Sequence, residues 1–171
     1  MPTLKILVAT MTGTAEVVAE AVQDRFGQLG GEAEIVMMDK LEPSALTSGG
    51  LHLVCSSTYG QGDVPDNAQA LFERLQVERP DLSGIRFGLI ALGDMTYQQT
   101  FCFGGKKISR LLADLGATML GDPLHHDASS GTLPEDVAVD WFEAWVETHD
   151  VLAEDAPGAS KEARFRQHVL A

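Results

Sequence analysis

The sequence is short of basic residues. Its 171 residues include 12 Lys and Arg against 25 Asp and Glu, which gives a formal net charge of −13. Nucleic acids and anionic membrane surfaces are bound by clustered Lys and Arg, so this charge argues against both as partners. It leaves a basic protein as the kind of partner that electrostatic attraction would favour.

Cysteine and long apolar runs are also scarce. Cys55 and Cys102 are the only cysteines, too few for a disulfide framework or a metal cluster. No apolar run approaches the roughly 18 residues of a membrane span, and residues 1–5 lead into a short apolar segment without a charged leader. The remaining composition is that of a globular domain. We therefore expect a cytoplasmic, monomeric protein.

Apolar segments alternate with amphipathic ones along the chain. Strands are predicted at Leu4–Ala9, Glu34–Met38, Leu51–Ser57, Arg86–Leu92 and Ala117–Leu124. Helices, with apolar residues at i, i+3 and i+4, are predicted at Thr14–Leu29, Asn67–Glu78, Gly104–Leu115 and Pro134–Val151. This alternation predicts an α/β three-layer sandwich with a five-stranded parallel sheet of order 2-1-3-4-5. We expect one domain over residues 1–152 and a C-terminal tail over residues 153–171.

A turn rich in hydroxyl groups follows the first predicted strand. Its residues are Thr10, Met11, Thr12, Gly13 and Thr14, followed by Ala15 and Glu16. Backbone N–H groups at a helix N-terminus, with hydroxyl groups beside them, bind phosphate through hydrogen bonds and the helix dipole. The alternative is an ordinary helix start, with a threonine as the cap and Glu16 in the first turn.

Two further turns carry the only two tyrosines of the chain. Tyr59 lies in the turn 56–67, where two glycines and a proline permit an unusual backbone path, and Tyr97 lies in the turn 92–102. The carboxyl ends of parallel strands meet at one edge of a sheet, so the two rings can enclose a flat aromatic ligand. The alternative for the turn 56–67 is an ordinary loop in which Asp66 or Asn67 caps the next helix.

The fingerprints of two other nucleotide classes are missing. The first strand is not followed by G-x-G-x-x-G, and G-x-x-x-x-G-K-[ST] is absent, since Phe103–Lys107 is better explained as a helix start with solvated lysines. A phosphate site combined with two aromatic rings predicts a phosphorylated flat cofactor. Flavin mononucleotide (FMN) fits this description better than an adenine dinucleotide.

These turns resemble those of a known family. Thr10–Glu16 (TMTGTAE), Ser56–Ala68 (SSTYGQGDVPDNA), Phe87–Cys102 and Pro134–Val146 are similar to segments of the flavodoxins. The likeness covers about residues 3–150 and is closest to the short-chain, MioC-type flavodoxins and to the FMN domains of diflavin reductases. It implies a cytoplasmic carrier of one or two electrons that binds FMN without a covalent bond. Its partners would be a flavodoxin reductase and an acceptor enzyme.

The resemblance also implies roles for individual residues. The phosphate would be held by the first turn, through Thr10, Met11, Thr12, Gly13, Thr14 and Ala15. One side of the isoalloxazine ring would be lined by Ser57, Thr58, Tyr59, Gly60 and Gly62, with the Gly60 carbonyl accepting N5–H of a neutral semiquinone. The other side would be lined by Leu92, Gly93, Asp94, Tyr97 and Phe101, with Tyr97 stacked on the ring. Asp127 resembles an acidic position near the ring, and Cys102 is expected to be a packed residue.

Two histidines and the distribution of acidic residues complete the expectations. His125 and His126 are expected in a polar loop, without a role as metal ligands. Residues 1–66 carry a net charge of −6 and residues 117–150 a net charge of −8, which predicts a docking face for a basic redox partner. Asp63, Asp94 and Asp127 would disfavour a fully reduced, anionic flavin and lower the second reduction potential.

Two alternatives to an electron carrier share the predicted fold. An FMN-dependent NAD(P)H:quinone oxidoreductase would need a nicotinamide site over the flavin, and no Arg-bearing loop for it is evident. A receiver domain needs adjacent acidic residues after the first strand, where this chain has Ala9, Thr10 and Met11. The receiver is therefore set aside, and the oxidoreductase remains the alternative function.

Overall fold

A parallel β-sheet forms the centre of the molecule. The computed structural model describes residues 3–154, and the order of its main strands is β2-β1-β3-β4-β5, as predicted. The strands are β1 (Thr3–Ala9), β2 (Glu32–Met37), β3 (Gly50–Ser56), β4 (Ile85–Gly93), β5 (Thr118–Met119) and β6 (Leu124–Asp127). The α/β sandwich and its strand order are thereby confirmed.

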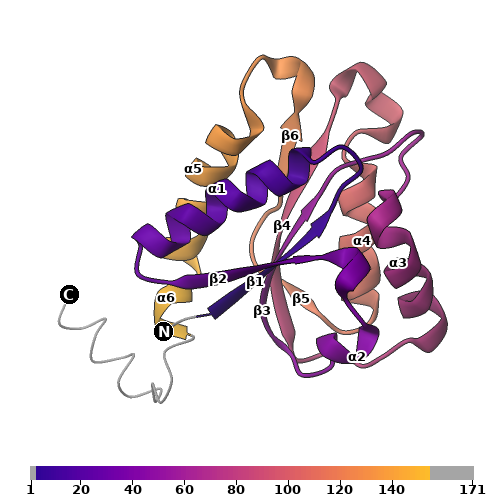
Figure 1. Cartoon of the computed structure of the whole chain (residues 1–171), viewed down its shortest axis with the longest axis vertical. Helices are drawn as coiled ribbons and strands as arrows, with labels where there is room; N and C mark the ends of the chain where they lie inside the picture. Colours follow the sequence, from indigo (N-terminus) through magenta and orange to yellow (C-terminus); the bar gives the residue numbers. More distant parts are fainter. Residues whose placement is uncertain (1–2, 155–171) are drawn as a thin grey trace.

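Helices cover both faces of this sheet (Figure 1). One face carries α1 (Thr14–Gln28) and α5 (Pro134–Thr148), and the other carries α3 (Asp66–Glu78) and α4 (Phe103–Asp114). The shorter elements are α2 (Pro43–Leu46), α6 (Val151–Glu154) and the 3₁₀ helices η1 (Met38–Lys40), η2 (Met95–Thr100) and η3 (Ala128–Ser130). Of these, η1 and α2 connect β2 to β3, in a stretch for which no helix was predicted.

Both faces of the central strands are buried. In β1, Leu4 and Ile6 pack toward α1 and α5, while Leu7 and Ala9 pack toward α3 and α4. Because side chains alternate along a strand and helices cover both faces, nearly every residue of such a strand is apolar. This is why β1, β3 and β4 were readable as continuous apolar runs.

The fifth predicted strand is divided in two. Ala117–Leu124 was expected as one strand, but β5 and β6 pair with β4 separately, and Gly121 lies between them with φ 70. Gly121 turns the chain and Pro123 offers no N–H for a ladder, so pairing stops there and resumes at Leu124. As a result β6 extends to Asp127, which pairs with Gly93 at the carboxyl end of β4.

The last predicted helix also ends early. Pro134–Val151 was expected as one helix, but α5 ends at Thr148 and Asp150 adopts φ 52 before α6 begins. Its buried side chains are Ala138, Phe142, Trp145 and Val146, whereas Val137 and Trp141 are only partly buried. The tail expected from residue 153 lies outside the described residues beyond Glu154.

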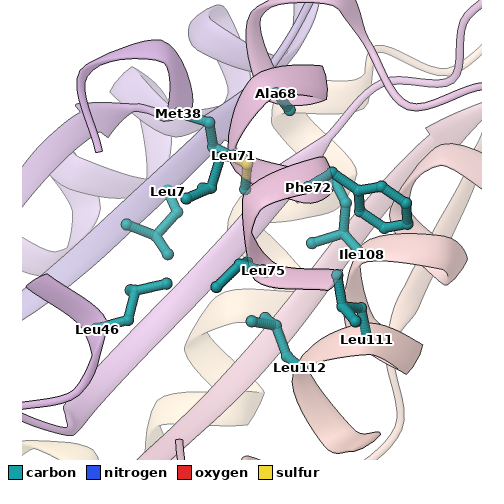
Figure 2. Close-up of a pocket in the computed structure, with 10 residues that line it drawn as sticks. All are labelled: Leu7, Met38, Leu46, Ala68, Leu71, Phe72, Leu75, Ile108, Leu111 and Leu112. Carbon is teal, nitrogen blue, oxygen red and sulfur yellow. The ribbon is translucent and has the colours of Figure 1, made fainter. Parts of the chain in front are cut away.

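A small gap remains in the core between β1, α2, α3 and α4 (Figure 2). Its volume is about 10 Å³, and every residue that lines it is apolar: Leu7, Met38, Leu46, Ala68, Leu71, Phe72, Leu75, Ile108, Leu111 and Leu112. A space of this size is the minimum for one water, and an apolar lining offers that water no hydrogen bond. It is therefore a packing gap and not a ligand site.

Candidate functional site

A cleft opens at the carboxyl ends of β1, β3 and β4. It has a volume of about 450 Å³, and its lining comes from all three predicted turns and from the start of η3: Thr12, Thr14, Ser57, Thr58, Gly60, Leu92, Gly93, Asp94, Tyr97, Thr100 and Ala128. Small-molecule sites usually enclose about 300–1,000 Å³, and they lie at this edge of open α/β sheets, where the strand order reverses. The three turns therefore meet around one site large enough for a cofactor.

The first turn is held in place by a residue of α3. The backbone N–H of Thr10 donates to Oδ1 of Asn67 at 2.8 Å, and Nδ2 of Asn67 donates to the carbonyl of Val8 at 3.1 Å. Within the turn, the Gly13 N–H donates to the Thr10 hydroxyl at 3.0 Å. Thr10 is buried, so its side chain supports the turn from below and does not line the cleft.

The start of α1 has no side-chain cap. Gly13 occupies the cap position with φ 92, and no side chain bonds to the first-turn N–H groups. The first N–H with a partner inside the helix is that of Val17, which donates to the Gly13 carbonyl at 3.1 Å. The N–H groups of Thr14 to Glu16 thus have no partner in the helix. The ordinary capped start is not what the structure adopts, and the uncapped N-terminus beside the cleft suits an anion.

The second turn is anchored through Thr58. Its hydroxyl donates to the Leu92 carbonyl at 3.0 Å and accepts the Gly104 N–H at 3.1 Å, so it ties the turn to β4 and to the start of α4. A tight turn follows, in which the N–H of Asp63 donates to the Tyr59 carbonyl at 2.7 Å. Thr58 also lines the cleft, so its hydroxyl fixes the turn while the residue remains part of the cleft wall.

The two tyrosines are placed differently. Tyr97 lines the cleft and is 66% exposed. Its ring is therefore accessible to a flat ligand in the cleft. Tyr59 is also exposed, but it is absent from the cleft lining, where Gly60 is the residue from that turn. The cleft lining therefore includes one aromatic ring, that of Tyr97, and one glycine turn, at Gly60.

The third turn is organised by two carboxylates. Asp94 accepts the N–H of Thr96 at 2.8 Å, and Asp127 accepts the N–H of Met95 at 2.9 Å and the hydroxyl of Ser129 at 2.7 Å. The bonds from Met95 and Ser129 hold the pKa of Asp127 below its ordinary value. Asp127 is thus a charged link between β6 and the loop that carries Tyr97, and its neighbour Ala128 lines the cleft.

The remaining predicted residues lie around the cleft without lining it. Ala15 is buried under the first turn of α1, Met11 is exposed, and Gly62 packs against Phe103. Phe101, near the end of the third turn, is partly buried, and its ring centroid is 6.4 Å from that of His125. These residues belong to the turns or to the helix start beside them, but not to the cleft lining.

The histidine pair lies in strand β6 and not in a loop. His126 is buried and its Nε2 is 2.9 Å from the Thr132 hydroxyl. His125 lies at the surface, where its ring is still partly shielded from water, and this desolvation lowers its pKa. Within residues 3–154, no three His, Cys, Asp or Glu side chains gather where a metal ion would fit, and no helix is long and apolar enough to cross a membrane.

Comparison with known proteins identifies the family. The flavodoxin family model matches residues 6–141. The chain belongs to the flavodoxin family. Protein MioC of Escherichia coli K12 is 36% identical over 146 residues, which cover 85% of this chain and 97% of MioC. An NADPH-dependent diflavin oxidoreductase of Cryptococcus neoformans is 34% identical over 141 residues, which make up 23% of that larger protein.

Solved flavodoxins share the fold. A cysteine-to-alanine mutant of flavodoxin from Pseudomonas aeruginosa is 32% identical, with a TM-score of 0.75 over 85% of this chain and 97% of that chain. A Fusobacterium nucleatum flavodoxin bound to flavin mononucleotide has a TM-score of 0.72 over 86% of this chain and 99% of that chain. At 16% identity, this second likeness concerns the fold alone.

Three residues of this flavodoxin's site were not predicted from the sequence. Thr100 and Ala128 line the cleft, and Asn67 holds the first turn. Asn67 was considered only as a cap for α3, but that helix has Pro65 at its cap position and no side-chain cap. The one feature of the sequence that could have indicated this role is the position of an Asn at the end of the turn 56–67, which faces the cleft. Ser57 adds a feature that sequence cannot show, a buried hydroxyl without a hydrogen-bond partner in the cleft wall.

The two cysteines give a direct test of the packing behind the site. Cys55 and Cys102 are both free and buried, and burial raises the pKa of each thiol to about 12. We expect neither to react measurably with a disulfide reagent such as DTNB at pH 8 in the folded protein. Both should react fully in guanidinium, at least about 1,000-fold faster, because only the thiolate attacks. Rapid labelling of one thiol in the folded state would show that its pocket opens.

Proposed function

We propose that this chain is an FMN-binding electron carrier that shuttles single electrons, through a neutral semiquinone, between a reductase and an acceptor enzyme. The observation that carries the proposal is the meeting of an uncapped helix N-terminus, an exposed tyrosine and a glycine turn around one cleft of about 450 Å³. The flavin supplies the redox chemistry when bound, and the protein binds it, orients it and sets its electrostatic surroundings.

Different groups of the cleft would contact different parts of FMN. The first-turn N–H groups of α1 and the hydroxyls of Thr12 and Thr14 would bind the phosphate, and the buried Ser57 hydroxyl is a further group in need of a partner. Tyr97 would stack on the ring from the η2 side. Gly60, with φ 53, can turn its peptide carbonyl toward or away from the ring, because glycine populates both signs of φ at little cost.

The proposal also covers the oligomeric state, the cellular compartment and the partners of the protein. We propose one FMN-binding domain over residues 1–152 that acts as a monomer in the cytoplasm, where the buried free thiols Cys55 and Cys102 are compatible with reducing conditions. A carrier needs no substrate site of its own. The isolated protein should therefore leave NAD(P)H unoxidised until a flavodoxin reductase is added, whereas an NAD(P)H:quinone oxidoreductase would turn over alone.

A spectral titration tests the cofactor and its redox behaviour together. We expect the purified protein to show the absorption of oxidised flavin, and stepwise reduction to pass through a blue, one-electron-reduced form. The second step should lie at a lower potential than in free FMN, because Asp63, Asp94 and Asp127 stand near the cleft and disfavour added negative charge. Reduction in a single step at the potential of free FMN would contradict the single-electron proposal.

Salt dependence tests the docking face. Residues 117–150 carry no Lys or Arg, and α5 presents acidic residues to solvent along its length. We expect the rate of reduction by a flavodoxin reductase to fall at least about tenfold between low salt and about 0.3 M salt, because screening removes long-range attraction to a basic surface. Stopped-flow absorbance measures this rate, and a rate independent of salt would contradict a basic partner.

A further inference from the structure

One exposed face of α4 carries positive charge in a strongly acidic chain. Lys106, Lys107 and Arg110 share this face, since residues three and four apart on a helix are neighbours. We refer to these three residues as the α4 basic patch. Lys107 Nζ lies 3.9 Å from Asp63, at the limit of an ion pair, and within the described structure Lys106 and Arg110 have no ion pair. The positive charge of the patch is therefore largely unneutralised.

The patch surrounds an aromatic floor. A groove of about 340 Å³ is lined by Phe103 together with the three basic residues. The Phe103 side chain is 36% exposed, and Lys106 Nζ lies 5.3 Å from its ring centroid and 5.8 Å from that of Phe101. The rings hold the ammonium group through cation–π attraction, which leaves its charge available to an anion. An aromatic surface ringed by cations suits an acidic segment that also has apolar atoms.

The patch is fixed to the wall of the FMN cleft. The Gly104 N–H donates to the Thr58 hydroxyl at 3.1 Å, and a Cβ on Gly62 would lie 3.1 Å from Phe103. The start of α4 thus rests directly on the turn that contains Gly60. A macromolecule bound at the patch would therefore lie beside the cleft.

We propose that the α4 basic patch docks an acidic segment of a redox partner protein and so sets the orientation of that partner over the cleft. The inference rests on the proposed electron carrier and names a second, oppositely charged contact for it. The partner would present basic residues to the acidic faces of this flavodoxin and an acidic segment to the patch. Such alternation of charge determines register and excludes wrong orientations more than it adds affinity.

A nucleic acid is the less favourable occupant. A polyanion needs an extended basic surface, and this patch is three residues in a chain of net charge −13. An acidic protein segment brings only a few charges, and its remaining surface can be basic. The test therefore compares these two polyanions directly.

The experiment uses the full chain loaded with FMN. A fluorescein-labelled, glutamate-rich peptide that contains one tyrosine serves as the probe, with anisotropy measured at about 0.01 M ionic strength, where screening is weak. Lys107→Gln with Arg110→Gln removes two charges of the patch and leaves the packed Lys106. The matched control, Lys40→Gln with Arg79→Gln, removes two exposed charges away from α4.

We expect the patch variant to lose affinity for the peptide at least about fivefold, and the control variant to stay within about twofold of the parent. No binding by the parent, or equal loss in both variants, would overturn the proposal. Tighter binding of a single-stranded oligonucleotide than of the peptide would overturn it in favour of a nucleic acid. FMN content and the redox spectrum, measured on every variant, report separately on the proposed electron carrier.

Discussion

Replacement of Gly104 by alanine should destabilise the protein by about 2–3 kcal/mol, although alanine is the better helix former. Gly104 is in the first turn of α4 and packs against the turn that follows β3. A Cβ at this position would overlap the Ser57 carbonyl oxygen and approach Thr58 Cα to 3.0 Å. Both neighbours are backbone atoms, so no rotation of a side chain can relieve the overlap.

The same replacement should weaken FMN binding. Relief of the overlap moves α4 away from the Thr58 turn and lengthens the hydrogen bond from the Gly104 N–H to the Thr58 hydroxyl, now 3.1 Å. Thr58 and Gly60 line the cleft, so a shift of this turn displaces groups that would contact FMN. We therefore expect the Kd for FMN to rise about tenfold. Urea denaturation of the apoprotein and fluorescence titration with FMN measure the two effects separately.

Gly27 provides the matched control. It lies in the last turn of α1, it is exposed, and a Cβ there would have no atom within 4 Å. Gly27→Ala should leave FMN binding unchanged and raise stability by up to about 0.5 kcal/mol, through helix propensity alone. If Gly104→Ala behaved like Gly27→Ala, the close contact between α4 and the Thr58 turn would not exist in solution.

The architecture was predictable because it depends on patterns that lie within short segments. Continuous apolar runs marked the doubly covered strands β1, β3 and β4, and helical periodicity marked α1, α3 and α4. The order of the sheet followed from this alternation, which is typical of doubly wound sheets. The positions of the three turns followed in the same way, since each comes directly after a strand.

The division of the fifth strand was not predictable from such patterns. Gly121 and Pro123 were visible in the sequence, but whether pairing would resume after them depended on the length of β4. The same pairing draws His125 to Asp127 into β6, although their polarity suggested a loop. Edge pairing therefore outweighed local composition at this position.

The role of a site residue was predictable only where that role depends on its neighbours in the sequence. The turn before α1 left a phosphate site and a threonine cap as alternatives, and the structure has no side-chain cap there. Tyr97 was predicted at the cleft from its place in a turn. Thr58 lines the cleft, but the bonds from its hydroxyl to Leu92 and Gly104, which are 34 and 46 residues away, were not predicted. Hydrogen bonds between distant segments leave no periodic signal in a sequence.

Asn67 is the clearest example of a residue whose role depends on distant segments. Its replacement by alanine should impair stability and FMN binding together. Its amide bonds the Thr10 N–H at 2.8 Å and the Val8 carbonyl at 3.1 Å, and the N–H of Gly13 in turn bonds the Thr10 hydroxyl. Alanine would leave a donor and an acceptor without partners where β1 enters the first turn. Such a loss costs about 1–3 kcal/mol.

FMN binding should weaken together with stability. An anion site built from backbone N–H groups depends on a fixed turn, because the cost of ordering a loose turn is subtracted from the binding energy. We expect Asn67→Ala to raise the Kd for FMN at least about tenfold and to lower the unfolding free energy of the apoprotein by about 1–3 kcal/mol. Gln69→Ala serves as the control, because Gln69 lies on the same helix, is exposed, and makes a bond of 3.3 Å to Val64 outside the cleft.

A second variant separates support of the turn from attraction for the phosphate. Asn67→Asp keeps an acceptor for the Thr10 N–H, so part of the lost stability should return. The new carboxylate brings negative charge to the turn, so affinity for FMN should stay low at neutral pH, whereas affinity for riboflavin, which has no phosphate, should match that of the parent. Retention of FMN affinity within about twofold in both variants would show that α3 does not organise this turn, and that the uncapped start of α1 is sufficient by itself.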